Sequence, residues 1–280
     1  MISGACLCGT LRYEVDGPVE SGMHCHCSMC RKHHGAPFAT FVLAPPSSLR
    51  WQAGESAVCE YPSSASRVRR FCGVCGAVAP AALAGRLLLP AGNLLGELAD
   101  VATLHMFVAS KAPWHVIADG LPEYEGAPNG WPLPEQVRPV PPQLDGAIHG
   151  SCSCAGVRFA VRGTPARWFQ CHCSRCRRGR SAAHGSNAFY APAQFEWLEG
   201  RQLVRSYRPP EAERFTISFC TRCGGGAPVE RENVPFILVP VALLDADPGG
   251  HPQAHIHVAS KAAWYTPKDG LPQFAELPPP

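Results

Sequence analysis

The sequence predicts a mainly β protein that consists of two tandem domains, each held together by metal ions. The chain has 280 residues, of which 46% are hydrophobic, and this is enough to build two cores. Glycine (27 residues) and proline (29 residues) are abundant while charged residues make up only 17%, which favours short strands and turns over long charged helices. The 15 cysteines are gathered in a pattern that occurs twice.

The two-domain prediction comes from an internal repeat that extends over nearly the whole chain. Four segments have counterparts in the second half: GACLCGTLRYEV (4–15) and GSCSCAGVRFAV (150–161), CHCSMCRK (25–32) and CHCSRCRR (171–178), FCGVCGA (71–77) and FCTRCGG (219–225), and VASKAPW…DGLP (108–122) and VASKAAW…DGLP (258–272). The offset between counterparts grows only from 146 to 150 residues. We therefore expect copy one at residues 1–130, a proline-rich linker at 131–146 and copy two at 147–280.

Short apolar or alternating segments predict the strands within each copy. The expected strands are 11–15, 38–42 and 87–89 in copy one, and 157–161, 215–219 and 235–241 in copy two. Short helices are expected after Cys30 and Cys176, and after Ser110 and Ser260, where each serine would act as the N-cap.

The cysteines predict metal sites rather than disulfides. The first residues, MISGACLCGT, lack the basic and apolar regions of a secretory signal, and the apolar stretch 78–95 is interrupted by Pro80, Arg86, Pro90 and Asn93. We therefore expect a cytoplasmic protein that does not enter a membrane. In that compartment clustered cysteines are more typical of metal binding than of disulfides.

Seven cysteines in each copy divide into four and three. A C-x-x-C-G turn is typical of a zinc knuckle, which presents two thiolates to one metal, and the C-x-C pair near the start of each copy can complete a tetrahedral site. This predicts structural zinc sites on Cys6, Cys8, Cys72 and Cys75, and on Cys152, Cys154, Cys220 and Cys223.

The other three cysteines of each copy form a trio that can bind a second ion. Three protein ligands with an open fourth position are typical of catalytic zinc. The candidate catalytic residues are therefore the two trios, Cys25, Cys27 and Cys30, and Cys171, Cys173 and Cys176. The alternative is a closed site, with a nitrogen from His24, His26 or His105 in copy one and from His172, His255 or His257 in copy two.

Metal binding also changes the net charge. The formal charge is +3, but fourteen thiolates with four Zn²⁺ ions would bring it to about −3. A basic run at Arg67, Arg69 and Arg70 has only dispersed counterparts in copy two and no interleaved aromatic residues. Nucleic-acid binding is therefore not expected.

The quoted motifs together resemble the glutathione-dependent formaldehyde-activating (GFA) family, which also occurs in centromere protein V. The resemblance covers each copy once and implies a β-tent fold. It also implies a structural zinc on the four cysteines and a second zinc on the trio, hence two zinc ions per domain and four per chain. The implied activity is that of a carbon-sulfur lyase, which forms S-hydroxymethylglutathione from glutathione and formaldehyde.

Several further residues are candidates for binding a small-molecule thiol or aldehyde adduct. Arg31, Lys32, Arg177 and Arg178 follow the trios directly and can receive the carboxylates of a glutathione-like substrate, or they form a solvated basic turn. Lys111 and Lys261 precede Trp114 and Trp264, and we expect each tryptophan to fill a core while each lysine neutralises a carboxylate or a carbonyl end. The aligned His105 and His255 are either structural or metal-associated.

Three interpretations of the function follow from these patterns. The first is a zinc-dependent carbon-sulfur lyase-like enzyme, and the second is a non-catalytic, zinc-stabilised binding or scaffold protein. In the third, copy one is active and copy two is a scaffold, because RRGRSAAHGS replaces RKHHGAPF in the second copy. The two halves can pack as a pseudo-dimer.

Overall fold

The computed structural model describes residues 1–96, 98, 101–131, 133 and 146–279. Most of the expected linker 131–146 therefore lies outside the described residues. Strands predominate, and the two α-helices of the described residues are short, so the mainly β prediction is confirmed. None of the helices in these ranges is long and apolar enough to cross a membrane.

Copy one forms three sheets. The first has the order β10-β1-β2-β5, with β10 Leu94–Leu95, β1 Ile2–Ala5, β2 Arg12–Val15 and β5 Leu49–Ala53. The second has the order β11-β3-β4-β9-β8, with β11 Ala102–Met106, β3 Glu20–Cys25, β4 Ala39–Ala44, β9 Arg86–Pro90 and β8 Ala81–Leu83. The third is the hairpin of β6 Val58–Ser64 and β7 Arg67–Cys72.

Copy two repeats this arrangement with one strand fewer in each of the first two sheets and one strand more in the third. The orders are β12-β13-β16, with β12 Ile148–Ser151, β13 Arg158–Val161 and β16 Phe195–Glu199, and β20-β15-β14-β21, with β20 Ile237–Pro240, β15 Gly185–Tyr190, β14 Arg167–Cys171 and β21 Ala254–Ile256. The third sheet is β17-β18-β19, with β17 Val204–Tyr207, β18 Ile217–Cys220 and β19 Gly226–Ala227. In both copies the only parallel pairing among these strands joins the strand that ends at the trio to the last strand of the copy, β3 to β11 and β14 to β21.

The expected strands correspond to β2, β4, β9, β13, β18 and β20, with ends that differ by one or two residues. The helices beside the trios also exist, as α1 Ser28–His34 and α2 Ser174–Arg180. The helices expected after Ser110 and Ser260 are wrong, because the 3-10 turns there, Val108–Ser110 and Val258–Ser260, end at these serines. The remaining 3-10 turns are Pro46–Ser48, Glu55–Ala57, Ala91–Asn93, Pro192–Gln194, Arg201–Leu203 and Val241–Leu243.

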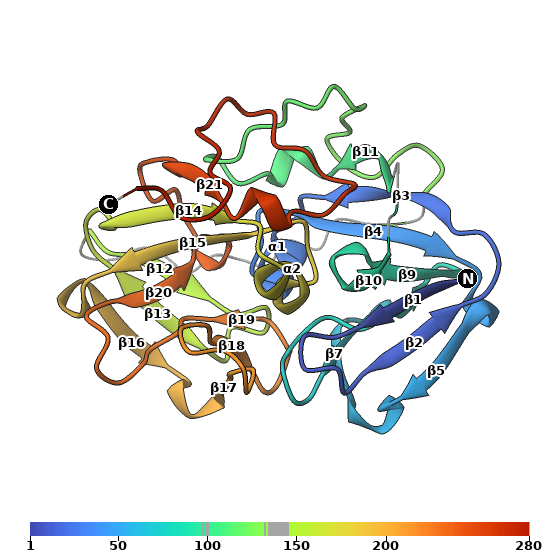
Figure 1. Cartoon of the computed structure of the whole chain (residues 1–280), viewed down its shortest axis with the longest axis horizontal. Coiled ribbons are helices and arrows are strands. Elements are labelled where there is room, and N and C mark those ends of the chain that lie inside the picture. Colours follow the sequence, from blue (N-terminus) through green and yellow to red (C-terminus); the bar gives the residue numbers. More distant parts are fainter. Residues whose placement is uncertain (97, 99–100, 132, 134–145, 280) are drawn as a thin grey trace.

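The two copies lie side by side, with α1 and α2 at the centre between them (Figure 1). Each helix reaches into the opposite copy with a cation: Lys32 Nζ donates to Ser151 O at 3.1 Å, and Arg178 Nη2 donates to Cys6 O at 2.6 Å. Lys32 and Arg178 occupy aligned positions of the repeat, so the contact between the copies is reciprocal.

The copies also exchange an aromatic side chain. Trp114 of copy one is buried in the core of copy two, where its ring packs edge-on against Trp168 at a centroid distance of 5.2 Å. Its counterpart Trp264 packs against the copy-one core that contains Tyr13 and Val15. The tryptophans therefore fill cores, as predicted, but each fills the core of the other copy.

Candidate metal centres and an adjoining cavity

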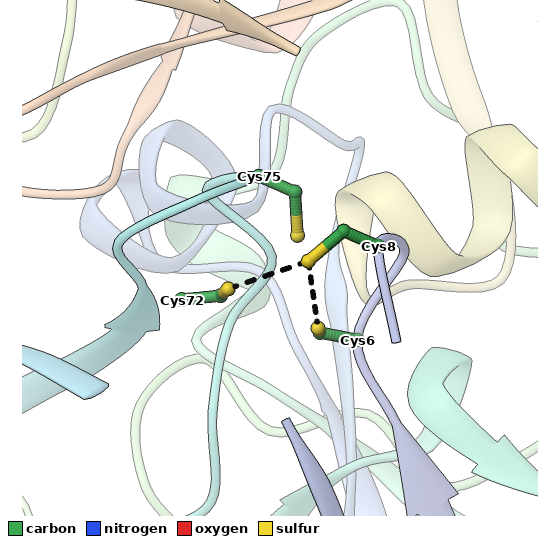
Figure 2. A group of neighbouring side chains, drawn as sticks. All are labelled: Cys6, Cys8, Cys72 and Cys75. Carbon is green, nitrogen blue, oxygen red and sulfur yellow. Dashed lines mark hydrogen bonds between the residues drawn. The ribbon is translucent and has the colours of Figure 1, made fainter. Parts of the chain in front are cut away.

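Four cysteine sulfurs converge in each copy, although the sequence separates the two pairs by more than 60 residues. Figure 2 shows Cys6, Cys8, Cys72 and Cys75 directed toward one point. The Sγ of Cys8 lies 3.4 Å from that of Cys6 and 3.7 Å from that of Cys72. A tetrahedral site with Zn–S bonds of 2.3 Å places its sulfurs about 3.8 Å apart. The four-sulfur cluster of copy one therefore fits a zinc ion.

The cluster of copy two has the same geometry. The Sγ of Cys154 lies 3.5 Å from that of Cys152 and 3.9 Å from that of Cys220, and the Sγ of Cys223 completes the group. Both predicted four-cysteine sets are thus brought together, and both fit zinc.

Local backbone geometry explains why these segments can form knuckles. In copy one, β7 ends at Cys72 and the chain turns back through Gly76, whose φ is +75°. Gly76 N donates to Cys72 O at 2.9 Å, and Cys72 N donates to Ala77 O at 2.8 Å. Glycine adopts a positive φ without steric cost, which is the reason for the G in C-x-x-C-G. Gly224, with a φ of +70°, does the same in copy two.

Short contacts among the four sulfurs of each cluster lower the pKa of some thiols and raise the pKa of others. Hydrogen bonds from the thiols of Cys6, Cys72 and Cys75 hold the pKa of Cys8 far below its ordinary value. In copy two, hydrogen bonds from the thiols of Cys152, Cys220 and Cys223 lower the pKa of Cys154 in the same way. Each cluster therefore already favours a thiolate, the form that binds a metal.

The trios lie at the junction of a strand and a short helix. In copy one β3 ends at Cys25, Cys27 is the N-cap of α1 and accepts a hydrogen bond from Cys30 N at 3.4 Å, and Cys30 lies in the first turn. The three sulfurs lie within 4.8 Å of one another, as do those of Cys171, Cys173 and Cys176. Among the described residues, no other histidine, cysteine or carboxylate has a ligand atom within 4.8 Å of all three sulfurs of either trio.

The histidines expected as alternative fourth ligands are hydrogen-bonded to other groups, and His257 of copy two pairs with Glu276 at 2.7 Å. His26 Nε2 lies 2.9 Å from His105 Nδ1, and His105 Nε2 lies 3.0 Å from both carboxylate oxygens of Asp119. His24 Nδ1 lies 2.9 Å from the hydroxyl of Thr40. Both ring nitrogens of His105 are therefore engaged away from the trio.

Copy two contains the same chain of hydrogen bonds, and its carboxylate fixes the direction of each bond. His172 Nε2 lies 2.8 Å from His255 Nδ1, and His255 Nε2 lies 2.9 Å from Asp269. A carboxylate only accepts, so His255 donates from Nε2 and accepts at Nδ1 from His172. Burial, followed by the neighbouring His255, lowers the pKa of His172 to about 3, so this imidazole is neutral near pH 7. These hydrogen bonds tie the trio segment to the DGLP segment of the same copy.

A cavity of about 310 Å³ opens beside the copy-one trio, and Cys25, Cys27 and Cys30 all line it. Most of its wall is apolar and consists of Met23, Phe41, Leu83, Leu88, Met106 and Phe107. Arg67 and Arg69 of β7 also line it, and Arg69 Nη1 lies 3.9 Å from the Sγ of Cys30. Hydrogen bonds from the thiols of Cys25 and Cys27, together with the charges of Arg69 and Arg67, hold the pKa of Cys30 well below its ordinary value despite burial.

The cations expected to receive a substrate carboxylate lie elsewhere. Lys32 is buried in the contact with copy two and pairs with Asp245, and Arg178 binds the backbone of Cys6. Arg31 donates to the carbonyl oxygens of His26 and Ser110.

These placements do not favour a substrate-binding role for three of the four cations, and that role stays a prediction. Lys32 and Arg178 bond to groups of the opposite copy, and Arg31, Lys32 and Arg178 are not among the residues that line the cavity. Burial, followed by the charge of Arg178, lowers the pKa of Arg177, and the charge of the nearby Cys173 opposes this effect. Arg177 stays a candidate in copy two.

The copy-two trio has different surroundings. Phe215 and Ile217 occupy the positions that align with Arg67 and Arg69. Phe215 packs against the apolar cluster that contains Cys171 and Cys176, and Asn187 Nδ2 lies 3.8 Å from the Sγ of Cys176. The two trios thus share their sulfur geometry but not their neighbours.

Sequence reasoning missed two groups of residues at these centres. Asp119 and Asp269 carried a usable signal, because each belongs to the repeated DGLP and lies 14 residues after the aligned histidine. Arg67 and Arg69 gave no repeat signal, since copy two has no arginine at their positions. Lys111 behaves as predicted: its Nζ donates to the carbonyl of His115 at 2.6 Å.

Comparisons with known proteins agree with the repeat. Residues 1–107 and 147–260 match the family model described as glutathione-dependent formaldehyde-activating enzyme. No curated protein matches the chain. A crystal structure of a Rhodobacter sphaeroides protein aligns with 26% identity over 37% of this chain and 97% of its own length, with a TM-score of 0.28.

Proposed function

Because the chain belongs to the glutathione-dependent formaldehyde-activating enzyme family, we propose that it is a zinc-dependent carbon-sulfur lyase-type enzyme that acts on a thiol adduct at the copy-one trio. The observation that carries this proposal is the open side of the trio. Three sulfurs converge from one short segment, no fourth side chain of the described residues joins them, and all three border a cavity of about 310 Å³. Catalytic zinc sites combine three protein ligands with an accessible fourth position.

The proposed reaction adds a thiol to an aldehyde, or reverses that addition. In the forward direction the sulfur of R–SH forms a bond to the carbonyl carbon of formaldehyde, the C=O π bond opens, and the thiol proton ends on the oxygen of R–S–CH₂–OH. When bound, zinc supplies Lewis acidity that favours the thiolate or polarises the carbonyl.

The protein's own residues would prepare the site for this chemistry. Cys25, Cys27 and Cys30 would hold the ion, and the N-cap hydrogen bond from Cys30 N to Cys27 Sγ would fix the sulfur of Cys27. The apolar wall would exclude water from the reacting atoms, and the charges of Arg69 and Arg67 would favour the thiolate form of Cys30.

The test is formaldehyde consumption in the presence of glutathione. We expect a rate above the uncatalysed reaction for the zinc-loaded chain, and loss of that excess in Cys27→Ser. Cys173→Ser is the matched control in copy two. Equal rates with and without the protein would reject this substrate pair.

A further inference from the structure

The cavity beside the copy-one trio contains two guanidinium groups that lack a carboxylate partner among the described residues. Arg69 is only 4% exposed, and its Nε has no hydrogen-bond partner. The Nη1 of Arg67 is also buried without a partner. The next arginine on the same strand, Arg70, is paired with Glu60 at 2.7 Å. Arg69 Nη1 contacts only the Sγ of Cys30 among the trio sulfurs. Burying cations whose counter-charge is incomplete is costly, so a built site of this kind is expected where a ligand supplies the remaining counter-charge.

Charge counting shows that the sulfurs alone do not supply it. Three thiolates and one Zn²⁺ carry a net charge of −1, and the two guanidinium groups change this to +1. One further negative charge, brought by a ligand, would make the loaded site neutral.

The shape and lining of the cavity limit the rest of the ligand. A volume of about 310 Å³ lies at the lower end of the range for small-molecule sites. Apart from the sulfurs, Ser66 and the two arginines, the wall offers apolar side chains such as Phe41, Leu88 and Met106. Among the lining residues this wall offers cations for one acidic group and no carboxylate for the ammonium group of a thiol such as glutathione, which carries two carboxylates and one ammonium group. We therefore expect a short apolar body with one acidic end to bind more tightly than glutathione.

Copy two provides an internal comparison. At the positions of Arg67 and Arg69 it has Phe215 and Ile217, and Phe215 covers the apolar cluster around Cys171 and Cys176. The same sulfur geometry therefore exists without this cation pair. The guanidinium groups that interact with the copy-two trio, Arg177 with Cys173 and the buried Arg180 with Cys176, come from α2 and not from the aligned strand positions.

We propose that the copy-one cavity binds a small thiol with one carboxylate and an apolar body, with Arg67 and Arg69 binding the carboxylate while the sulfur faces the trio, and that copy two does not bind this ligand. The position of the sulfur rests on the proposed function. The binding of the carboxylate by the two arginines does not.

Calorimetric titration of the zinc-loaded full chain tests the carboxylate part, with hexanoate and 1-hexanol as probes. We expect hexanoate to bind at one site per chain and more tightly than hexanol. Arg67→Gln and Arg69→Gln should each weaken hexanoate about 10- to 100-fold, the effect of losing a charged hydrogen bond, and leave hexanol unchanged. Arg70→Gln is the matched control on the same strand and should change neither.

Three results would overturn the inference: equal affinity for hexanoate and hexanol, unchanged hexanoate binding in Arg67→Gln, or two equivalent sites per chain. Zinc content and circular dichroism check that each variant is folded. If Arg69→Gln does not fold, Arg67→Gln carries the test, because Arg67 is the less buried of the two.

A third probe separates this inference from the proposed function. 6-Mercaptohexanoate should bind more tightly than hexanoate, and Cys27→Ser should remove the difference. Arginine-dependent hexanoate binding without any gain from the thiol would support the anion site and reject the thiol chemistry. A gain from the thiol without any arginine dependence would do the opposite.

Discussion

Lys32 of copy one and Asp245 of copy two form a buried ion pair, with Nζ 2.5 Å from Oδ1 and side chains that are only 6% and 2% exposed. The same Nζ also donates to the hydroxyl of Ser151 and to the carbonyl of Leu243. A charged pair that is this well bonded and excluded from water is expected to be costly to break.

Lys32→Ala should therefore lower the free energy of unfolding by about 3–5 kcal/mol, because it leaves the Asp245 carboxylate buried and unpaired. Denaturant unfolding of the zinc-loaded protein measures this. Arg86→Ala is the control, since its pair with Glu20 is half exposed on both sides and should contribute less than about 1 kcal/mol. Equal losses in the two variants would contradict the assigned role of Lys32.

Gly224 is expected to serve both the knuckle and the contact between the copies. Its φ is +70°, and an added Cβ would lie 2.3 Å from the Cγ of Phe71 in the opposite copy. Gly249 has the same φ with no neighbouring atom within 4 Å of such a Cβ. Gly249→Ala should therefore cost only the backbone strain, about 1–2 kcal/mol, while Gly224→Ala should cost clearly more and reduce the zinc content. Thermal unfolding with zinc analysis compares them, and equal shifts would show that the contact with Phe71 is unimportant.

The buried histidines between the copies predict a loss of stability in mild acid. Burial, then the neighbouring His172 and His255, lowers the pKa of His184 well below 6.5, so the unfolded chain binds a proton there that the folded chain does not. Stability from this residue is thus complete above about pH 6.5 and falls by about 1.4 kcal/mol for each pH unit below it.

His184→Phe provides the matched variant, because Phe38 occupies the aligned position in copy one. The variant should lose less stability than the wild type between pH 7.5 and pH 5.5, measured by denaturant unfolding at each pH. Parallel losses over this range would show that His184 is not the group that titrates.

The cysteine pattern could be predicted from the sequence because zinc ligands have restricted spacing. The knuckles at Cys72–Cys75 and Cys220–Cys223 each need one turn with a glycine, and a strand such as β2 shows an alternation of buried and more exposed residues. The repeat doubled each of these signals. For this reason the strand positions and the four-sulfur groups agree with the structure.

The exchange of tryptophans could not be predicted in the same way. Trp114 and Trp264 have similar local sequences, SKAPW and SKAAW, and the two cores available to them are built from aligned residues. Local sequence patterns predict that a tryptophan is buried, but they do not predict which copy's core it fills. The packing of one copy on the other determines which core each tryptophan fills.

The position of Arg67 and Arg69 in the cavity could not be predicted from the sequence either. Arg67 and Arg69 alternate with exposed Val68 in a two-stranded hairpin, a pattern that is typical of a surface strand with charged side chains. Their burial follows from the side on which β7 passes the trio, which is a tertiary relationship. The sequence distinguishes the copy-one cavity only by a difference between the copies: Arg67 aligns with Phe215, and Arg69 aligns with Ile217.

An anomalous-scattering map at the zinc edge, from crystals of the zinc-loaded chain, tests the central claim most directly. We expect four peaks per chain, two at the four-cysteine clusters and two at the trios. At Cys25, Cys27 and Cys30 we expect a fourth ligand that is water or a small molecule in the cavity. A histidine nitrogen bound to that ion, or the absence of a peak there, would contradict an open zinc centre in copy one.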